Sequence, residues 1–252
     1  MVLAWLAFFD GLLAITLVAL GIIGAHYYIV PSITGFGLLA FGFLLSIIGS
    51  LVGLLAIFLT RKPERRAGRN RAVVGTVICL VIAIPLFVML MGGRKHPIND
   101  ITTDFDSPPE FVFAQKLQPG RDMKYDKGKY ADKQQASYGP IGPIKERLEP
   151  SAAFERVREV AQAVPTWKIT YTDTTKNTLE AVSTSRLFHF QDDVVIEIRP
   201  TPDGESLIEM RSKSRDGIGD FGVNARRIRR FFDRVAMSRG KVEAQTPQED
   251  LP

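Results

Sequence analysis

The chain has 252 residues, of which 32 are basic, 27 are acidic and one, Cys79, is a cysteine. A single cysteine excludes an internal disulfide framework and a cysteine-based zinc site, and it leaves the redox compartment open. Most of the charge excess lies in one loop, since residues 61–71 carry six basic residues and one acid. The rest of the chain is almost neutral and lacks the basic folded surface of a nucleic-acid-binding domain, so we expect no nucleic-acid partner.

Three apolar runs are long enough to cross a bilayer, which takes about 20 helical residues. They lie within residues 3–30, at 33–59 and at 72–91. Because the cationic loop joins the second run to the third, the positive-inside rule predicts that this loop is cytoplasmic. The amino terminus is then cytoplasmic too, and everything after residue 91 lies outside. In a Gram-negative cell that means three spans in the inner (cytoplasmic) membrane and a periplasmic domain.

The polar and small residues of these runs leave alternatives open. A cleaved signal peptide is the alternative for the first run, but there is no positive amino-terminal region and no clear cleavage site, so we expect three retained spans over residues 1–92. Asp10 is either an intramembrane functional group or, as we favour, a headgroup-level residue before a span that begins at Leu12. Small residues four positions apart in the second run predict close approach of a neighbouring helix of the same chain. They are Gly42, Ser46 and Ser50, and Gly49 with Gly53.

After the spans the chain reads first as an extended linker and then as a compact domain. Residues 93–150 are rich in proline, glycine, aspartate and lysine without a sustained period, which is typical of a linker or wrapping segment. Apolar residues at three- and four-residue steps predict helices over 151–164 and 221–237. Between these helices, strand-like runs joined by short, turn-rich connections span residues 167–172, 178–185, 188–199 and 206–214.

We therefore predict an α+β domain over residues 151–240, with an antiparallel four-stranded sheet and two helices on one face, followed by a disordered tail at 241–252. The last hairpin tests the register of this sheet. Opposite charges face each other if Glu197 lies opposite Arg211, whereas like charges do so if it lies opposite Glu209. We expect the register with Arg211.

The stretch 217–222, GIGDFG, matches the G-x-G-x-x-G pattern of dinucleotide-binding turns. That fold requires a parallel strand after the following helix, and none is predicted here, so we do not expect a nucleotide site. One interpretation is a tight turn in which Asp220 caps the last helix. The other is an anion site, because free amides at a helix start and nearby cations suit a negative ligand.

The charge around this turn supports the interpretation as an anion site. Seven basic residues and two acids lie between positions 211 and 230. The candidate ligand-binding residues are Arg211, Lys213, Arg215, Gly217, Asp220, Gly222, Asn224 and Arg227. Besides the lipid bilayer, the expected partner is an anionic small molecule or lipid headgroup, with an envelope protein as a further alternative. The competing explanation is a solvated basic face.

Residues with acid–base chemistry support a rival hypothesis, an extracytoplasmic hydrolase-like enzyme. The candidate catalytic residues are His96, Asp100, Asp104, His189 and Asp192. The first three lie in a segment without a period to align them, and no G-x-S-x-G elbow is present. With two histidines and no cysteine after the spans, we expect no metal site and no cofactor. We favour a non-enzymatic binding or scaffolding role in the cell envelope.

Several motifs together resemble one family. They are HPINDITTD with PPEF, YGPIGPI, F-x-F-x-DDVVIEI and the block RSKSRDGIGDFGVNARRIRRF. This combination, over residues 97–232, is similar to the domain-of-unknown-function family 1499. In the terminal block the family's pattern is matched by Arg215, Gly217, Asp220, Gly222 and Asn224. Gly219 stands where the family has serine, and YGPIGPI departs from its YPDI-x-PL. The resemblance implies a bacterial or plastid protein, often membrane-attached or exported, and it implies no activity.

Overall fold

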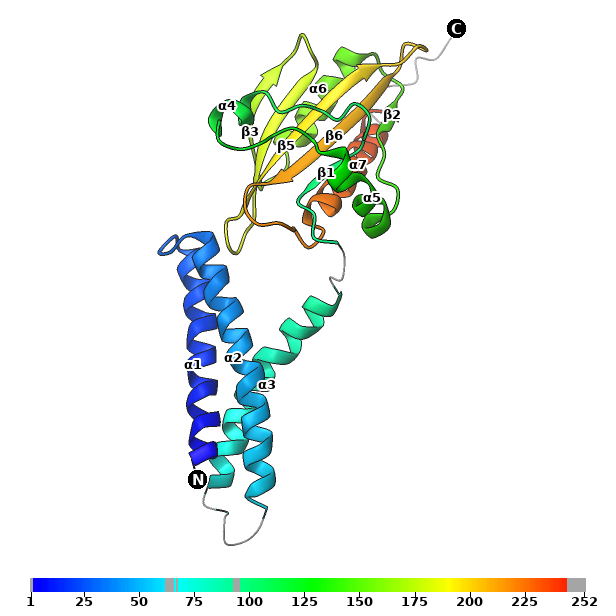
Figure 1. Ribbon diagram of the computed structural model, residues 1–252. Coiled ribbons are helices and arrows are strands. Elements are labelled where there is room, and N and C mark those ends of the chain that lie inside the picture. The colour runs from blue at the N-terminus through cyan, green and yellow to red at the C-terminus, as the bar shows by residue number, and fades with distance from the viewer. Residues whose placement is uncertain (1, 62–65, 67, 93–95, 244–252) are drawn as a thin grey trace. The chain divides into compact units, whose positions relative to one another are not determined.

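The structure is a computed structural model that describes residues 2–61, 66, 68–92 and 96–243 (Figure 1). The chain divides into two compact units. The first comprises Met1–Arg94 and Arg186–His189, and the second comprises Lys95–Ser185 and Phe190–Pro252. The last helix continues to Glu243, and the remainder of the predicted tail lies outside the described residues.

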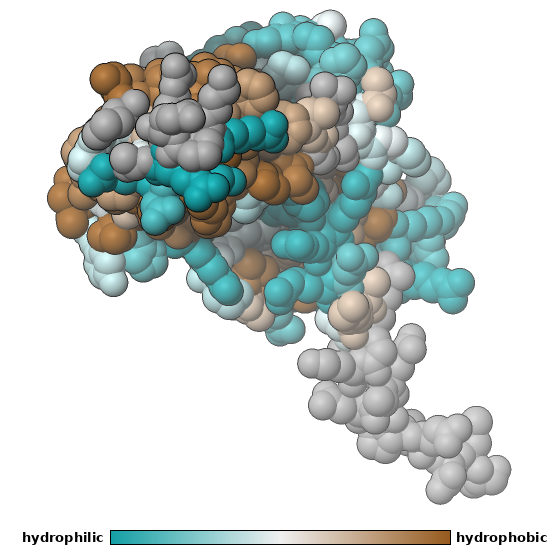
Figure 2. Space-filling view, turned by 90° about the horizontal axis from the view of Figure 1, so that it is seen from below, coloured by the Kyte–Doolittle hydropathy of each residue, from teal (hydrophilic) through white to brown (hydrophobic). Residues whose placement is uncertain are grey.

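The first unit contains three long apolar helices: α1 (Val2–His26), α2 (Ser32–Leu59) and α3 (Arg69–Gly92). At 1.5 Å per residue each is long enough to cross the hydrocarbon core of a bilayer, and each is apolar enough to do so. Hydrophobic residues gather over the helical unit, whereas hydrophilic residues dominate the surface of the other unit (Figure 2). The three apolar helices expected from the sequence are confirmed.

Small residues allow these helices to pack closely. The buried residues of α1 recur at steps of about three and four: Ala4, Ala7, Gly11, Ala14, Gly21, Gly24 and Ala25. A Cβ added to Gly42 of α2 would lie 2.8 Å from the carbonyl oxygen of Ala14, and one added to Gly53 would collide with Thr76 of α3. The expected approach of neighbouring helices is therefore confirmed.

Asp10 lies inside α1 rather than before it. The helix begins at Val2, ten residues before Leu12, so the helical segment is longer than the span expected from the sequence. The carboxylate of Asp10 lies beside Gly49 of α2 and near Cys79 of α3, in the seam between the three helices.

The second unit is built on one antiparallel sheet with strand order β1-β6-β5-β4-β3, in which β2 also pairs with β6. The strands are β1 (Asp100–Thr102), β2 (Ile144–Glu146), β3 (Trp167–Asp173), β4 (Thr178–Thr184), β5 (Gln191–Pro200) and β6 (Ser206–Ser214). The α+β architecture is confirmed, but the sheet has six strands rather than four. The two additional strands are three residues long and lie in the segment expected to be a linker, where no periodicity could reveal them.

Helices cover one face of the sheet and an irregular segment covers the other. The second unit contains the helices α4 (Phe113–Leu117), α5 (Lys127–Tyr138), α6 (Pro150–Gln162) and α7 (Val223–Glu243). As predicted, α6 and α7 share one face, while the chain around α4 crosses the opposite face (Figure 1). The start of α6 is favoured by Pro150, since proline at a first helical position loses no hydrogen bond.

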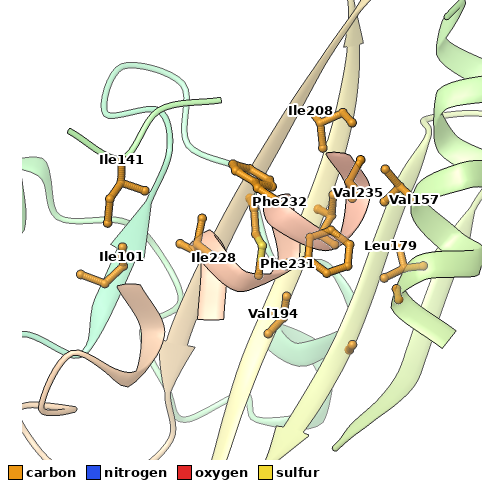
Figure 3. Close-up of a cluster of buried hydrophobic side chains, with 14 of the residues drawn as sticks. Ile101, Ile141, Val157, Leu179, Val194, Ile208, Ile228, Phe231, Phe232 and Val235 are labelled. Carbon is orange, nitrogen blue, oxygen red and sulfur yellow. The ribbon is translucent and has the colours of Figure 1, made fainter. Parts of the chain in front are cut away.

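The main core lies between the sheet and the two helices. Leu179, Val194 and Ile208 point from the strands toward Phe231 of α7 and Val157 of α6 (Figure 3). All five are fully or almost fully buried, so this face is an ordinary apolar interior. A smaller cluster on the opposite face contains Phe111, Ala114, Met123 and Val195.

Two sequence expectations about the strands are wrong. Strand β5 begins at Gln191 rather than at Phe188, and His189 lies in the preceding loop with a φ of 56°. A run of residues that carries one position in the left-handed region cannot continue an extended ladder. The predicted strand position of His189 is therefore replaced by a turn.

The register of the last hairpin also differs, because Glu197 pairs with Glu209 and not with Arg211. Turn chemistry decides it: Gly204 has a φ of 77° and donates its N–H to the carbonyl of Thr201 at 3.0 Å. A three-residue Pro-Asp-Gly loop of this kind fixes which residues face each other. The two glutamates are held by one cation, since Arg199 lies 3.0 Å from Glu197 and 2.9 Å from Glu209.

Candidate functional site

The corner between β6 and α7, which we define as residues 215–223, is a tight capped turn (Figure 1). Gly217 and Gly222 have φ values of 79° and 77°, a region that side chains disfavour. The Asp220 carboxylate accepts hydrogen bonds from the N–H groups of Gly222 at 2.8 Å and Asn224 at 2.6 Å. Burial raises the pKa of Asp220, although these bonds oppose the shift. Asp220 therefore satisfies amide groups at the helix start, as the turn interpretation predicts.

The topology excludes a dinucleotide-binding turn at this corner. Strand β6 pairs antiparallel with β1, β2 and β5. In the part of the chain that the structure describes, no strand follows α7, so there is no parallel crossover unit to hold a nucleotide.

Arg211, the first predicted ligand residue, lies on β6 in the interior with 1% of its surface exposed. Its guanidinium makes a two-pronged ion pair with Asp100, at 2.9 and 2.8 Å, and donates to the carbonyl of Met123 at 2.8 Å. The rings of Phe111 and Tyr125 lie 5.0 and 5.4 Å from its central carbon. Every direction in which this cation can bind is therefore occupied by the domain itself.

The next two predicted cations on β6 are also paired inside the domain. The Lys213 ammonium lies 2.8 Å from the same carboxylate of Asp100. Arg215 contacts the buried carboxylate of Asp193 at 2.7 Å, and Arg121 reaches that carboxylate from the covering segment at 2.8 Å. Together with the ion pair of Arg211, these contacts form a charged layer on the face of the sheet opposite the two long helices, with buried carboxylates and with Arg121 and Arg215 at its partly exposed edge. We define the charged layer as Asp100, Arg121, Asp193, Arg211, Lys213 and Arg215.

Asn224 and Arg227 complete the predicted set on the first turns of α7. The Asn224 side chain is fully buried, accepting from Ser212 at 2.7 Å and donating to Ser214 at 3.0 Å. Arg227 forms an ion pair with Asp192, which is the role of that predicted catalytic residue in the structure. The structure thus divides the predicted ligand residues between the two faces of the sheet. Arg211 and Lys213 pair with Asp100 on the face of the charged layer, whereas Asn224 and Arg227 bond to Ser212 on the face covered by α7.

The exposed apolar residues of the corner were not among the sequence candidates. Ile218 is 83% exposed and Phe221 is 50% exposed, and Phe221 has a φ of 50°. Four arginines follow on the outward side of α7, opposite the apolar stripe that enters the core. We define this arginine face as Arg226, Arg229, Arg230 and Arg234, with Asp233 as the one acid among them. Helical spacing of the arginines was the signal that could have identified it.

The candidate catalytic residues do not converge. Asp100 and Asp192 are committed to ion pairs, and Asp104 accepts from the N–H groups of residues 106 and 107. Neither His96 nor His189 contacts any of these carboxylates within the described residues. No group of three potential metal ligands occurs in the described part of the chain either.

A depression of about 800 Å³ lies between the β3–β4 hairpin, the end of β5 and the segment 106–112. Arg199 lines it and is surrounded by Glu197, Glu209 and, at 3.6 Å, Asp104. Burial raises the pKa of Glu209 to about 7, against the lowering effect of Arg199. Arg199 is already saturated by carboxylates, so its guanidinium is not free to bind a ligand in this depression.

Comparison with known families assigns the second unit. The family model described as protein of unknown function (DUF1499) matches residues 100–235, which is more than half of the chain. None of the curated proteins matches the chain. The matched residues contain the whole sheet, the charged layer, the corner and most of α7.

Proposed function

Because the chain belongs to the DUF1499 family, whose description assigns no function, we propose a role from the geometry alone: it is a membrane-anchored binding protein whose domain binds anionic lipid headgroups. The binding surface is the arginine face of α7 together with the corner. The proposed role is non-enzymatic, with the three apolar helices serving as the anchor.

One observation carries the proposal, namely the difference between the inner and outer cations of the domain. The cations of the charged layer already have carboxylate partners within the domain. The arginine face is exposed, and its four arginines are accompanied by one acid, Asp233. A phosphate-bearing headgroup supplies the counter-charge that this surface lacks, and arginine is the side chain best suited to phosphate.

The proposed localisation and membrane topology follow from the charge distribution along the chain. We propose that the loop at 61–71 is cytoplasmic, that the helices lie in the cytoplasmic membrane, and that the domain lies outside the cytoplasm in the cell envelope. A hydrolase-like activity has no support from the positions of the candidate catalytic residues. An envelope protein partner remains an outcome of the test below.

The test is binding of dioctanoyl phosphatidylglycerol and dioctanoyl phosphatidylcholine to the full chain in a neutral detergent. We expect preferential, saturable binding of the anionic lipid. The double substitution Arg226→Ala plus Arg230→Ala is expected to weaken this binding about fivefold or more, which corresponds to about 1 kcal/mol. The matched control is Arg147→Ala plus Lys168→Ala, which removes two exposed cations elsewhere on the domain.

Competition identifies the chemistry that is recognised. If inorganic phosphate displaces the lipid, the site accepts a free anion as well as a headgroup. If the two lipids bind equally, or if both double variants bind like the original chain, headgroup recognition by the arginine face is wrong. In that case the exposed face would be tested for an envelope protein partner.

A further inference from the structure

The corner carries exposed apolar side chains beside the arginine face, and we infer that it inserts into the interface of the same bilayer that holds the three helices. This inference rests on the proposed function, and it adds which membrane is bound and how. The inserted residues are Ile218, Phe221 and Val223, whose exposed fractions are 83%, 50% and 39%.

Chain length keeps the corner close to the membrane, whatever the orientation of the domain. Helix α3 ends at Gly92, and Pro97 follows it by five positions. At no more than about 3.6 Å per residue, Pro97 lies within about 18 Å of the helix end. A candidate span of this kind ends at the headgroup level, so the residues just after it cannot leave the vicinity of the bilayer.

Hydrogen bonds then fasten the corner to that first segment of the domain. The Asn99 side chain donates to the carbonyl of Gly217 at 2.7 Å, and the N–H of Asp220 donates to the carbonyl of Ile98 at 3.2 Å. Gly219 approaches Pro97 so closely that an added Cβ would lie 3.0 Å from the Pro97 Cα. The part of the domain nearest to the membrane along the chain therefore carries the exposed side chains of Ile218, Phe221 and Val223.

The conformation of Phe221 is a second, independent observation. Its φ of 50° lies in the left-handed region, which a bulky aromatic residue adopts only against a steric cost. Half of the side chain is exposed, so packing within the domain does not account for the choice of phenylalanine. Glycine or asparagine would suit the turn better. An aromatic ring at a bilayer interface supplies a reason that the fold does not.

The surrounding charge suits a bilayer rather than a protein groove. Apolar side chains followed by a basic helix face are the arrangement found in segments that lie at a membrane surface. Arg226 and Arg230 follow Val223 by three and seven positions, so they lie on the first two turns of α7 beside the apolar residues. Insertion of the corner would bring these guanidinium groups to the depth of the lipid phosphates.

The experiment measures the depth of the corner in full-length protein. A nitrobenzoxadiazole fluorophore is attached through Ile218→Cys in a Cys79→Ala background, and the chain is reconstituted into phosphatidylcholine vesicles with or without phosphatidylglycerol. Some of the lipids carry brominated acyl chains, which quench a fluorophore only in the hydrocarbon region. The control label is attached through Thr175→Cys, an exposed position in the β3–β4 hairpin. That hairpin lies at the opposite end of the sheet, about 20 Å along β4.

We expect at least about twofold stronger quenching at position 218 than at position 175 in both lipid mixtures, and loss of that difference with Phe221→Asn plus Val223→Ser. Equal quenching at the two positions overturns the inference, even if the short-chain anionic lipid binds. Strong quenching at position 218 together with equal binding of the two short-chain lipids means that the corner inserts and that headgroup recognition fails. Circular dichroism of each labelled protein shows that the domain is folded.

Discussion

The two faces of the sheet in the second unit differ in the way they are covered. Toward α6 and α7 the sheet presents aliphatic residues that meet a single apolar core. Toward the segment 103–125 it presents the charged layer, in which Asp100 and Arg211 are 0% and 1% exposed. Alternation of apolar and polar residues along the strands predicts that one face of the sheet is polar. It does not distinguish a polar face in water from a polar face covered by another segment. The difference teaches that polar residues on a strand indicate a partner, which here is part of the same chain.

Removing one member of the charged layer is expected to have the largest effect. In Asp100→Asn, Arg211 and Lys213 lose their common counter-charge while both remain buried. We expect the free energy of unfolding to fall by about 4 kcal/mol, because an unpaired buried cation is strongly destabilising. The measurement is denaturant unfolding of the full chain in detergent, followed by the fluorescence of Trp167, which stacks on Phe231.

The matched control for this change is Asp203→Asn, which removes an exposed partner of Lys145. Surface ion pairs contribute about 0–1 kcal/mol, so little change is expected. A cost for Asp100→Asn that is no larger than the cost for the control would show that Asp100 is not needed to neutralise Arg211 and Lys213.

A truncation on the apolar face is expected to be slightly less damaging. Leu179→Ala leaves a cavity beneath the two helices and should lower the free energy of unfolding by about 3 kcal/mol. Leu117→Ala, at an exposed position of α4, serves as the control and should change stability little. If Leu179→Ala proves far more costly than Asp100→Asn, the apolar face dominates the stability of the domain.

Titration of Glu209 should make the stability of the domain depend on pH. Burial raises its pKa in the folded domain to about 7, above the ordinary 4.5, so the folded state binds the additional proton between these values. The stabilisation is complete below about pH 4.5 and is lost as pH rises through 7. We expect a loss of about 2 kcal/mol between pH 5 and 8. Glu209→Gln should remove this dependence, and an unchanged slope would contradict the assignment.

Outside both faces, a change at the corner should have the smallest effect and the opposite sign. Phe221→Asn relieves a left-handed aromatic residue and should raise the free energy of unfolding by about 0.5 kcal/mol. Thermal unfolding of the full chain measures it, with Phe113→Asn as a control at a position of ordinary helical geometry. Destabilisation by Phe221→Asn would mean that the ring packs within the domain after all.

Much of the fold follows from periodicity, and its failures have identifiable causes. The three apolar helices, α6, α7 and the strands with alternating residues were predicted because each is long enough to show a repeat. Strands β1 and β2 were missed because they are only three residues long. The hairpin register was wrong because the Pro-Asp-Gly loop fixes it locally, and Arg199 lies where it can neutralise both Glu197 and Glu209.

The capped turn was predicted, and the partners of the nearby cations were not. Sequence placed cations and a capped turn around residues 211–230, and in the structure Asp220 caps the turn while the cations of β6 pair with carboxylates of other segments. It could not show that Asp100, more than one hundred residues earlier, neutralises Arg211 and Lys213. Such pairing depends on which face of the sheet a distant segment crosses. The exposure of Ile218 and Phe221 likewise depends on the path of the turn.

The ion pair between Asp100 and Arg211 also limits when the domain can fold during synthesis, because the two residues are separated by 111 positions. At ribosomal speeds of about 5–20 residues per second, Arg211 appears on the order of ten seconds after Asp100. During this interval the three apolar helices have already been synthesised. Strands β1 and β2 still lack β6, the strand with which both pair. Such long-range pairing makes folding slow, and it means that the domain closes only after nearly all of it has been made.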